Sequence, residues 1–338
     1  MNKRIIWLII GMFFILVQFS NPVFARTYRL TYSIFFPESH GQCKVGMDWA
    51  KEIEKRTNGQ VVITAFPGGT LTKAKQCYDG VVKGVTDIGM SVFAYTRGRF
   101  PVMEAVDLPL GYSSGLLATQ VVNSFYQQVQ PKELSDVQVM YLHAHGPGLF
   151  HTQKPVQKLE DLIKMKIRST GLSTNVVEAL GAVPVPMPQG STYDALKKGI
   201  VEGTFGPMEA LKGWRQAEVI HYSTDCKDIG FTTAMFVVMN RSKWNSLPKN
   251  IQDVFIDVNK KWIDVHGNAW DALDKEGEEY TRQRKNFIFN LSEEEIERWQ
   301  KAVEPLVYNY SDKMKAKNLP GKEYIDRLTK LIQEHQNK

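Results

Sequence analysis

The first part of the chain alternates between strand-like and helix-like spacings of its apolar residues. Residues 27–34 alternate in the manner of a strand, and residues 44–55 place their apolar side chains on one helical face. The segments 60–66, 72–83 and 87–91 continue this succession as strand, helix and strand. The order predicts a β-α-β-α-β unit, which is typical of a doubly wound α/β sheet.

A second α/β region follows further along the chain. Residues 138–145 alternate like a strand, and a glycine-rich turn at 146–148 separates them from an extended segment at 150–152. Residues 164–207 then repeat the succession of short strands and helices, and a last long strand is predicted at 231–239. Strands that alternate with helices again indicate a parallel sheet.

Two connections between these regions predict a fold of two lobes. The turn at 146–148 and the segment near Phe231 each carry the chain from one region to the other. After Pro248 a helical pattern runs from residue 250 past residue 279, which is long enough to cross more than one domain. We therefore expect an α/β clamshell that catches a ligand between its lobes by hinge closure.

One isolated arginine, Arg168, ends the short strand predicted at 164–168. Open α/β sheets bind ligands beyond the carboxyl ends of their strands. A guanidinium at that place suits a carboxylate, because its planar fork matches both oxygens and it stays charged at physiological pH. We expect Arg168 to bind a ligand carboxylate; the alternative is a structural salt bridge.

Other candidate ligand contacts lie in or beside the loops predicted to line this crevice. His40 follows the carboxyl end of the first strand and is expected to contact the ligand. Any single aromatic residue could instead belong to a hydrophobic core, so we expect about half of the aromatic candidates to touch ligand. These candidates are Phe93, Tyr95, Phe150, Phe205 and Trp214.

Histidines near the first connection raise the possibility of a metal site. His143 and His145 are two residues apart on a predicted strand, and His151 lies beyond the turn. Zinc sites need three or four converging ligands, so histidines that are hydrogen-bonded within the fold are the better interpretation. We expect neither a metal nor a cofactor.

The amino terminus has the features of a secretory signal peptide. A basic start is followed by an apolar run at 5–19 and by small residues that end at Ala25. The run is shorter than the roughly 20 residues of a membrane-spanning helix, although an uncleaved anchor is the alternative. Cleavage after Ala25 predicts a soluble periplasmic protein and lowers the formal net charge from +6 to +4, because Lys3 and Arg4 are removed. No cluster of basic and aromatic residues indicates nucleic-acid binding.

The three cysteines, Cys43, Cys77 and Cys226, include no C-x-x-C pair. This argues against zinc and thioredoxin-type chemistry. An odd number in an oxidising compartment predicts one disulfide and one free thiol. Cys43 and Cys77 lie near the starts of the first two predicted helices and are the expected pair; the alternative is that all three are small buried side chains.

Taken together in order and spacing, several segments resemble the substrate-binding proteins of tripartite ATP-independent periplasmic (TRAP) transporters, of the DctP type. The resemblance covers nearly the whole mature chain, and no single motif decides it. The matching segments are residues 59–69, 81–89, 100–101, 107–109, 154–155, 161–168, 181–184 and 193–203.

The resemblance implies a type II-like periplasmic-binding-protein clamshell with a long helix spanning both lobes. The two connections and the long helix after Pro248, read from the sequence itself, predict that residues 26–147 with 232–272 form lobe I and residues 148–231 with 273–338 form lobe II, after the predicted signal peptide at 1–25. The implied function is that of the solute-binding subunit of a TRAP transporter, without a catalytic site. The implied partners are an organic acid and integral membrane subunits, and a monomer is expected.

Site residues of the family match individual positions. The arginine that binds the substrate carboxylate matches Arg168, and a family tyrosine matches Tyr193, although residues 189–192 depart from the usual serine-glutamate step. A second arginine of sialic-acid-binding members falls at Gly148, and the following asparagine falls at Gly206. These two differences argue against sialic acid and favour a monocarboxylate with a substantial apolar or aromatic body.

Three other functions are weighed against this one. A periplasmic hydrolase would need a nucleophile with an oriented base, and the chain has no G-x-S-x-G and no H-E-x-x-H motif. A receptor that hands its ligand to a sensor kinase and an ABC-type binding protein remain alternatives, which neighbouring genes would distinguish from a TRAP subunit.

Overall fold

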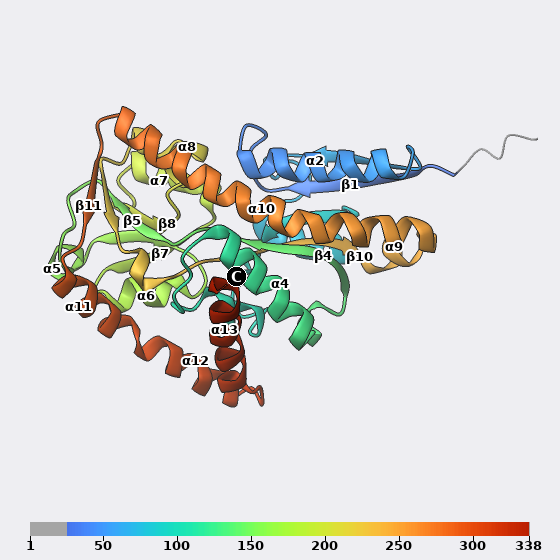
Figure 1. The fold of residues 1–338 in the computed structure, drawn as a ribbon. Helices are drawn as coiled ribbons and strands as arrows, with labels where there is room; N and C mark the ends of the chain where they lie inside the picture. The colour runs from blue at the N-terminus through green and yellow to red at the C-terminus, as the bar shows by residue number, and fades with distance from the viewer. Residues whose placement is uncertain (1–25, 338) are drawn as a thin grey trace, which may run out of the picture.

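The computed structural model describes residues 26–337, whose strands form two mixed sheets (Figure 1). The first sheet has the order β2-β1-β3-β10-β4 and the second β11-β9-β5-β8-β6-β7. The strands of the first sheet are β1 Tyr28–Ile34, β2 Val61–Phe66, β3 Ile88–Val92, β4 Val137–Ala144 and β10 Ala234–Asn240. Those of the second are β5 Leu149–Thr152, β6 Lys166–Ser169, β7 Val183–Pro186, β8 Gly203–Gly206, β9 Tyr222–Asp225 and β11 Phe287–Asn290. The α/β clamshell expected from the sequence is confirmed; the predicted signal peptide lies outside the described residues.

Each sheet contains one strand that runs against its neighbours. In the first sheet β10 is antiparallel to both β3 and β4, and in the second β5 is antiparallel to both β8 and β9. Both strands follow a point where the chain passes from one sheet to the other, from β4 to β5 and from β9 to β10. The two connections touch, because Gly148 N donates to Phe231 O at 2.9 Å. They form a paired hinge between lobe I, built on the first sheet, and lobe II, built on the second.

The helices cover the sheets and join the lobes. Helices associated with the first sheet are α2 Gly41–Arg56, α3 Cys77–Val82, α4 Gly115–Val129 and α9 Arg241–Asn245. Those of the second are α5 Leu159–Leu162, α6 Ser173–Ala179, α7 Thr192–Lys197, α8 Ala210–Gly213 and α11 Glu293–Val303. The remaining helices are α10 Lys249–Gln283, α12 Pro305–Lys315 and α13 Gly321–Gln336.

Helix α10 is the long helix that the sequence pattern predicts. It begins directly after Pro248 and continues for 35 residues, a length of about 50 Å at the usual rise per residue. Its first part packs against α2, α4 and β4, and its last part packs against α8 and β11. Figure 1 shows it running obliquely from α9 in lobe I to β11 at the edge of lobe II. The helix therefore connects both lobes with one continuous backbone.

The predicted pairing of Cys43 with Cys77 is wrong, since all three cysteines are free and buried. Helix α2 places Cys43 in the core on one side of the first sheet, together with Trp49 and Met90. Helix α3 places Cys77 in the core on the opposite side, where its thiol faces Gly89 of β3. Neighbouring strand residues point to opposite faces, so the sheet separates the two thiols.

The carboxyl-terminal helices return to lobe I, although the sequence pattern groups residues 273–338 with lobe II. Trp299 of α11 does pack in lobe II against Phe150, with ring centroids 5.5 Å apart. Helix α13, however, packs on α4, and Leu328 and Ile332 are buried in the lobe I core. An amphipathic helix specifies that one face is buried but not which lobe covers it.

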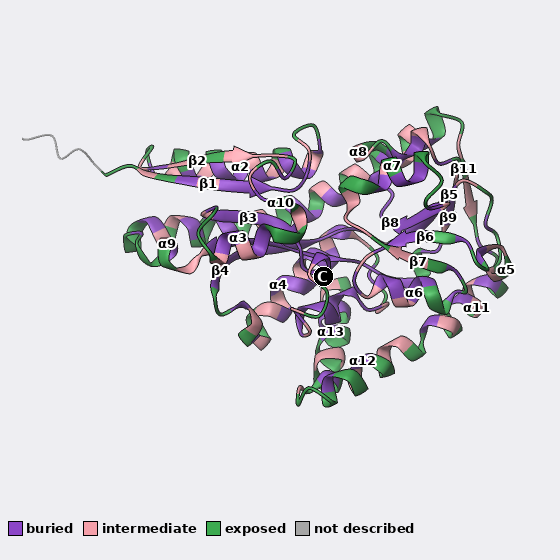
Figure 2. Ribbon diagram, turned by 180° about the vertical axis from the view of Figure 1, so that it is seen from behind, coloured by how far each residue is buried: buried purple, intermediate pink, exposed green. Residues whose placement is uncertain are grey.

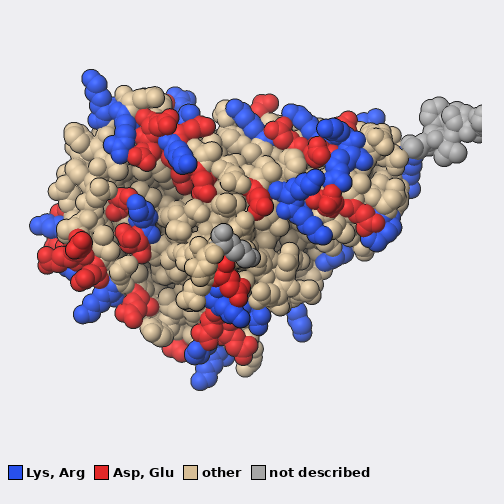
Figure 3. Space-filling view, in the orientation of Figure 1, with Lys and Arg blue, Asp and Glu red and all other residues tan. Residues whose placement is uncertain are grey.

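Neither a membrane-spanning helix among the described residues nor an extended charged patch on the face drawn in Figure 3 is found. No helix within residues 26–337 is long and apolar enough to cross a membrane. Figure 2 shows buried residues concentrated on the strands and on the inner sides of the helices. On the face drawn in Figure 3, basic and acidic side chains are interspersed, so no extended patch of one sign forms there.

Candidate functional site

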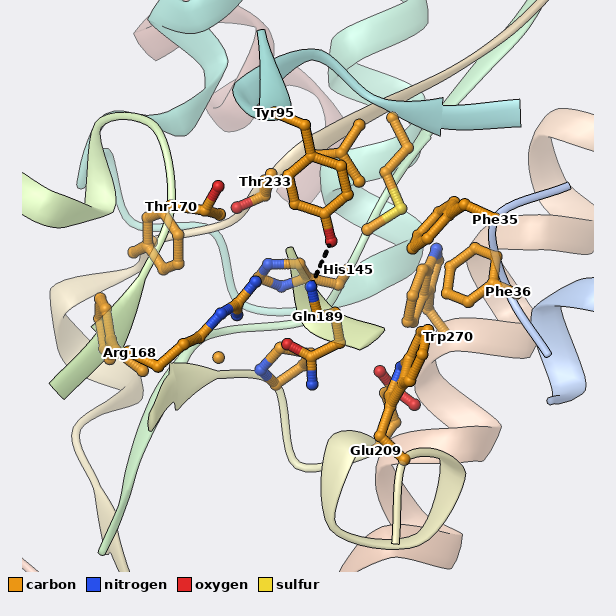
Figure 4. A pocket seen from close by; sticks show the side chains of 17 residues that line it. Phe35, Phe36, Tyr95, His145, Arg168, Thr170, Gln189, Glu209, Thr233 and Trp270 are labelled. Atoms are coloured by element: carbon orange, nitrogen blue, oxygen red, sulfur yellow. Dashed lines mark hydrogen bonds between the residues drawn. The ribbon is translucent and has the colours of Figure 1, made fainter. Parts of the chain in front are cut away.

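A cavity lies between the two lobes (Figure 4), with about 430 Å³ of space not filled by atoms, open solvent included. From lobe I it is lined by residues that follow the carboxyl ends of β1, β3 and β4, and from lobe II by residues at the ends of β6, β7 and β8. Both sheets thus direct the ends of their parallel strands at one space, which is where α/β sheets place their ligands.

Arg168 lies near the end of β6, between β7 and β8, and only 4% of its surface is exposed. Its Nε donates to Met187 O at 3.1 Å, which fixes the direction of the side chain. Burial lowers the pKa of the guanidinium, and the neighbour that opposes this effect is the hydroxyl of Tyr95. No carboxylate of the described residues forms an ion pair with it. An arginine stays charged under these conditions, so the cavity contains a buried positive charge that the chain itself does not neutralise.

Tyr95 reaches the cavity from lobe I and faces Arg168. Its hydroxyl oxygen accepts a hydrogen bond from Gln189 N at 3.0 Å, which links the two lobes. Burial raises the pKa of the phenol, so the hydroxyl keeps its proton and can donate it. Thr170 and Thr233 add two further hydroxyl groups to the cavity wall. This end of the cavity therefore offers donors to an anion.

His145 lines the cavity beside these groups. Burial lowers its pKa to about 4, so the ring is neutral at pH 7. Nδ1 lies 2.5 Å from Gly146 O, and because a carbonyl oxygen can only accept, Nδ1 carries the ring proton. Nε2 is left as a hydrogen-bond acceptor. The sequence pattern places His145 at the hinge between the lobes. In the structure it also forms part of the cavity wall.

Glu209 lies at the opposite side of the cavity from Arg168 in Figure 4, just before α8. It is 3% exposed, and its Oε2 lies 2.8 Å from His40 Nε2. The backbone N–H of Gln42 donates to His40 Nδ1 at 3.2 Å, so Nδ1 is the acceptor nitrogen and Nε2 carries the proton. His40 is therefore a neutral ring that donates to Glu209.

Aromatic rings form the wall near Glu209. The rings of Phe36 and His40 stack with centroids 4.5 Å apart, and Trp214 lies 5.9 Å from Phe36. Trp270 of α10 is fully buried, and its ring centroid lies 6.0 Å from that of Phe36. Together with Phe35 these rings make the end of the cavity remote from Arg168 largely apolar.

The structure separates the residues singled out from the sequence into three groups. Five of them line the cavity, namely Arg168, Tyr95, Phe205, Gly206 and Trp214. His40 lies behind the wall and contacts Glu209, and Phe150 stacks behind Phe205 at 4.5 Å. Phe93 and Tyr193 do not line the cavity. Phe93 packs against Phe100 and Phe236 in the lobe I core, and the Tyr193 hydroxyl donates to Glu218 at a separate surface groove.

Several residues that line the cavity are not predicted from the sequence. Phe35 and Phe36 follow the carboxyl end of β1, so the rule that identifies Arg168 would also have identified them. Glu209 lies just beyond the carboxyl end of β8 and follows the same rule, whereas Trp270 does not. Trp270 comes from the middle of α10, which reaches the cavity from a distant part of the sequence. Only the packing of α10 against α8 brings the two together.

The two glycines that distinguish this chain from sialic-acid binders have different surroundings. A Cβ at Gly206 would meet no atom within 4 Å, so this position opens into the cavity. A Cβ at Gly148 would lie 2.6 Å from Cδ1 of Phe231, so this position is filled by a neighbouring ring. Only Gly206 provides the extra room that the sequence pattern assigns to both.

No three His, Cys, Asp or Glu side chains within residues 26–337 converge in the manner of a metal site. His143 Nδ1 accepts a hydrogen bond from Trp270 Nε1 at 3.1 Å, and His151 Nδ1 pairs with the Ser223 hydroxyl at 2.8 Å. These histidines take part in the internal hydrogen bonding of the two lobes.

Asp274 of α10 holds the segment that carries Glu209, since its Oδ1 accepts the Glu209 N–H at 2.8 Å. The residue is partly exposed, but its carboxyl group packs inward against Gly146. Burial raises the pKa of this carboxyl to about 8, against an unfolded value of about 3.9. Between these two values the folded state retains a proton that the unfolded state releases, so the free energy of unfolding falls as pH rises.

Asp274→Asn, which cannot ionise but keeps an acceptor oxygen, is expected to become progressively more stable than the native protein between pH 5 and pH 8.5. Thermal unfolding of both proteins at pH 5, 7 and 8.5 measures the difference. Asp264→Asn, on the same helix with its carboxylate exposed, is the matched control and should show no such trend. A stability difference for Asp274→Asn that does not change with pH would contradict the assignment.

Comparison with known proteins identifies the family to which the chain is similar. The family model DctP, described as bacterial extracellular solute-binding protein, family 7, matches residues 32–313. A monocarboxylate 2-oxoacid-binding periplasmic protein of Nostoc sp. is 28% identical over 275 residues, which cover 75% of this chain and 70% of that relative.

Two solved structures share the fold over nearly the whole chain. A TRAP periplasmic solute-binding protein of Desulfovibrio salexigens is 31% identical with a TM-score of 0.81, covering 92% of this chain and 97% of that one. A TRAP solute-binding protein of Rhodoferax ferrireducens, in complex with copurified benzoate, is 25% identical with a TM-score of 0.88, covering 92% and 99%.

Proposed function

Because this chain belongs to the DctP family of bacterial extracellular solute-binding proteins, family 7, we propose that it captures a small organic monocarboxylate and delivers it to the membrane subunits of a TRAP transporter. The family consists of binding proteins and not of enzymes. We further propose that removal of residues 1–25 places the mature chain in the periplasm. The resemblance found from sequence is confirmed at the level of the family.

The observation that carries this proposal is the buried guanidinium of Arg168. A buried charge without a partner is costly, and a ligand carboxylate that accepts two parallel hydrogen bonds would offset that cost. Nε is already occupied by Met187 O, so the two terminal nitrogens are the groups that would donate to the ligand. Tyr95, whose hydroxyl keeps its proton, would donate to one of the same oxygens.

The body of the ligand is proposed to be apolar or aromatic. The wall opposite Arg168 consists of the rings of Phe35, Phe36, Trp214 and Trp270. Gly206 leaves open space where a side chain would otherwise project. Aromatic rings stack favourably on such walls, and benzoate, the ligand named for the Rhodoferax relative, is an aromatic monocarboxylate; the ligand named for the Nostoc relative is a monocarboxylate 2-oxoacid.

A thermal-shift screen across organic acids tests this proposal. Aromatic and branched 2-oxo or 2-hydroxy acids are expected to raise the melting temperature more than succinate, malate or sialic acid, because a ligand stabilises the folded state by RT ln(1 + [L]/Kd). A protein that responds most strongly to dicarboxylates would contradict the proposed ligand class, because a second cation would then have to face the cavity. A protein that responds to no organic acid would contradict the binding function itself.

A further inference from the structure

We propose that Glu209 is a second specificity determinant: it accepts a hydrogen bond from a hydroxyl or ammonium group on the ligand and rejects a second carboxylate at that place. The inference rests on the proposed function, since it concerns the part of the ligand remote from the carboxylate that Arg168 would hold. It assigns the ligand to monocarboxylates that carry a hydrogen-bond donor at their far end.

The first step is that one oxygen of Glu209 remains available to the cavity. Its Oε2 receives the Nε2 proton of His40 at 2.8 Å. No hydrogen bond within residues 26–337 uses Oε1, although Glu209 lines the cavity and is 3% exposed. A carboxylate oxygen can only accept hydrogen bonds. The far end of the cavity therefore presents an acceptor oxygen to a ligand.

The second step is that this oxygen is held in place. The His40 side chain is completely buried and stacks on Phe36, and its other nitrogen is fixed by the backbone of Gln42. A Cβ at Gly213 would lie 2.6 Å from both Glu209 Oε2 and His40 Nε2. The Gly213 backbone therefore packs closely against these two side chains. Glu209 cannot turn away from the cavity without breaking these contacts.

The third step concerns charge. His40 and His145 are neutral for the reasons given above, so Arg168 and Glu209 are the charged groups that line the cavity. A ligand with one carboxylate can place it at Arg168 and keep its uncharged or positive end near Glu209. A dicarboxylate would bring a second negative charge next to a buried carboxylate, and like charges side by side in an interface cost several kcal/mol.

A matched series of benzoates tests the inference by calorimetry. The probes are benzoate itself and benzoates that carry a hydroxyl, an aminomethyl or a second carboxylate group at ring position 3 or 4. The native protein is expected to bind the better hydroxyl isomer about tenfold more tightly than benzoate, because a hydrogen bond to a charged group is among the stronger ones. The dicarboxylates should bind at least about a hundredfold more weakly. The aminomethyl probes show whether an ammonium is preferred over a hydroxyl.

Glu209→Gln presents an amide of the same shape, whose oxygen can accept from His40 while its N–H groups face the cavity. The advantage of the hydroxyl and aminomethyl probes should fall to about twofold or less, and the dicarboxylates should gain at least about tenfold. Glu209→Asp keeps the negative charge and should still reject dicarboxylates. The melting temperatures of both unliganded variants establish that they fold.

The outcomes separate the two proposals. If benzoate binds in a manner that depends on Arg168, but Glu209→Gln leaves the ranking of the probes unchanged, this inference fails and the proposed function stands. If the native protein binds benzoate and the dicarboxylates with equal affinity, this inference also fails and the proposed function stands. If no probe binds to the native protein, this inference is overturned, and the thermal-shift screen of 2-oxo and 2-hydroxy acids then decides the proposed ligand class.

Discussion

Arg168→Ala is expected to lower the affinity for the ligand carboxylate by at least about thirtyfold, because removing one partner of a buried charge pair costs roughly 2–5 kcal/mol. The loss is large for a physical reason. Arg168 is only 4% exposed, and no other lysine or arginine within residues 26–337 lines the cavity. Calorimetric titration with the best ligand of the thermal-shift screen measures the effect.

Arg168→Lys should also bind poorly, because an ammonium cannot reproduce the fork that donates to both carboxylate oxygens and to Met187 O. The unliganded Arg168→Ala protein should be no less stable than the native protein, since it loses a buried charge that has no carboxylate partner in the chain. Arg282→Ala, at an exposed ion pair of α10, is the control and should bind normally. Affinity close to native in Arg168→Ala would refute the anchoring role.

Trp270→Ala is expected to cause the largest loss of stability among single substitutions near the cavity, about 3–5 kcal/mol. The Trp270 side chain is fully buried and stacks on His143 with centroids 5.9 Å apart. Its Nε1 also donates to His143 Nδ1 at 3.1 Å. His143 Nε2 is buried and has no hydrogen-bond partner within residues 26–337, so loss of the tryptophan would leave both ring nitrogens unpaired.

Urea unfolding measures this loss of stability. The dependence of the unfolding free energy on urea concentration should be the same in the native protein and the variants. Trp270→Phe keeps a ring but removes the donor, and should cost about 1–3 kcal/mol, the usual cost of an unsatisfied buried polar group. Trp262→Ala, at a partly buried position of the same helix, should cost clearly less than Trp270→Ala. Equal losses in the two alanine variants would show that burial at the cavity does not set the effect.

Local patterns were enough to predict much of the fold. The alternation of strands and helices predicts both sheets, and the long run after Pro248 predicts α10. The rule that ligands bind beyond strand ends brings Arg168, Tyr95 and Gly206 to the cavity wall. The same rule cannot tell which way a side chain near a strand points, and for this reason it favours Phe93 and Phe150 at the wall although both pack in the hydrophobic cores.

The rest depends on contacts between distant parts of the chain. Glu209 and His40 are 169 residues apart and meet only because α8 and the start of α2 face the same cavity. Trp270 and His143 are 127 residues apart and meet across α10 and β4. The separation of Cys43 from Cys77 depends on which face of the sheet each helix covers. No local spacing encodes these choices.

The return of α13 to lobe I has a consequence for the order in which the chain can fold. The core beside α4 contains Tyr78 near one end of the sequence and Ile332 near the other. During synthesis or passage through a membrane, the amino-terminal half therefore emerges without the segment that closes its core. We expect lobe I of the half-made chain to keep apolar surface exposed beside α4, and to reach its final packing only after α13 has been released.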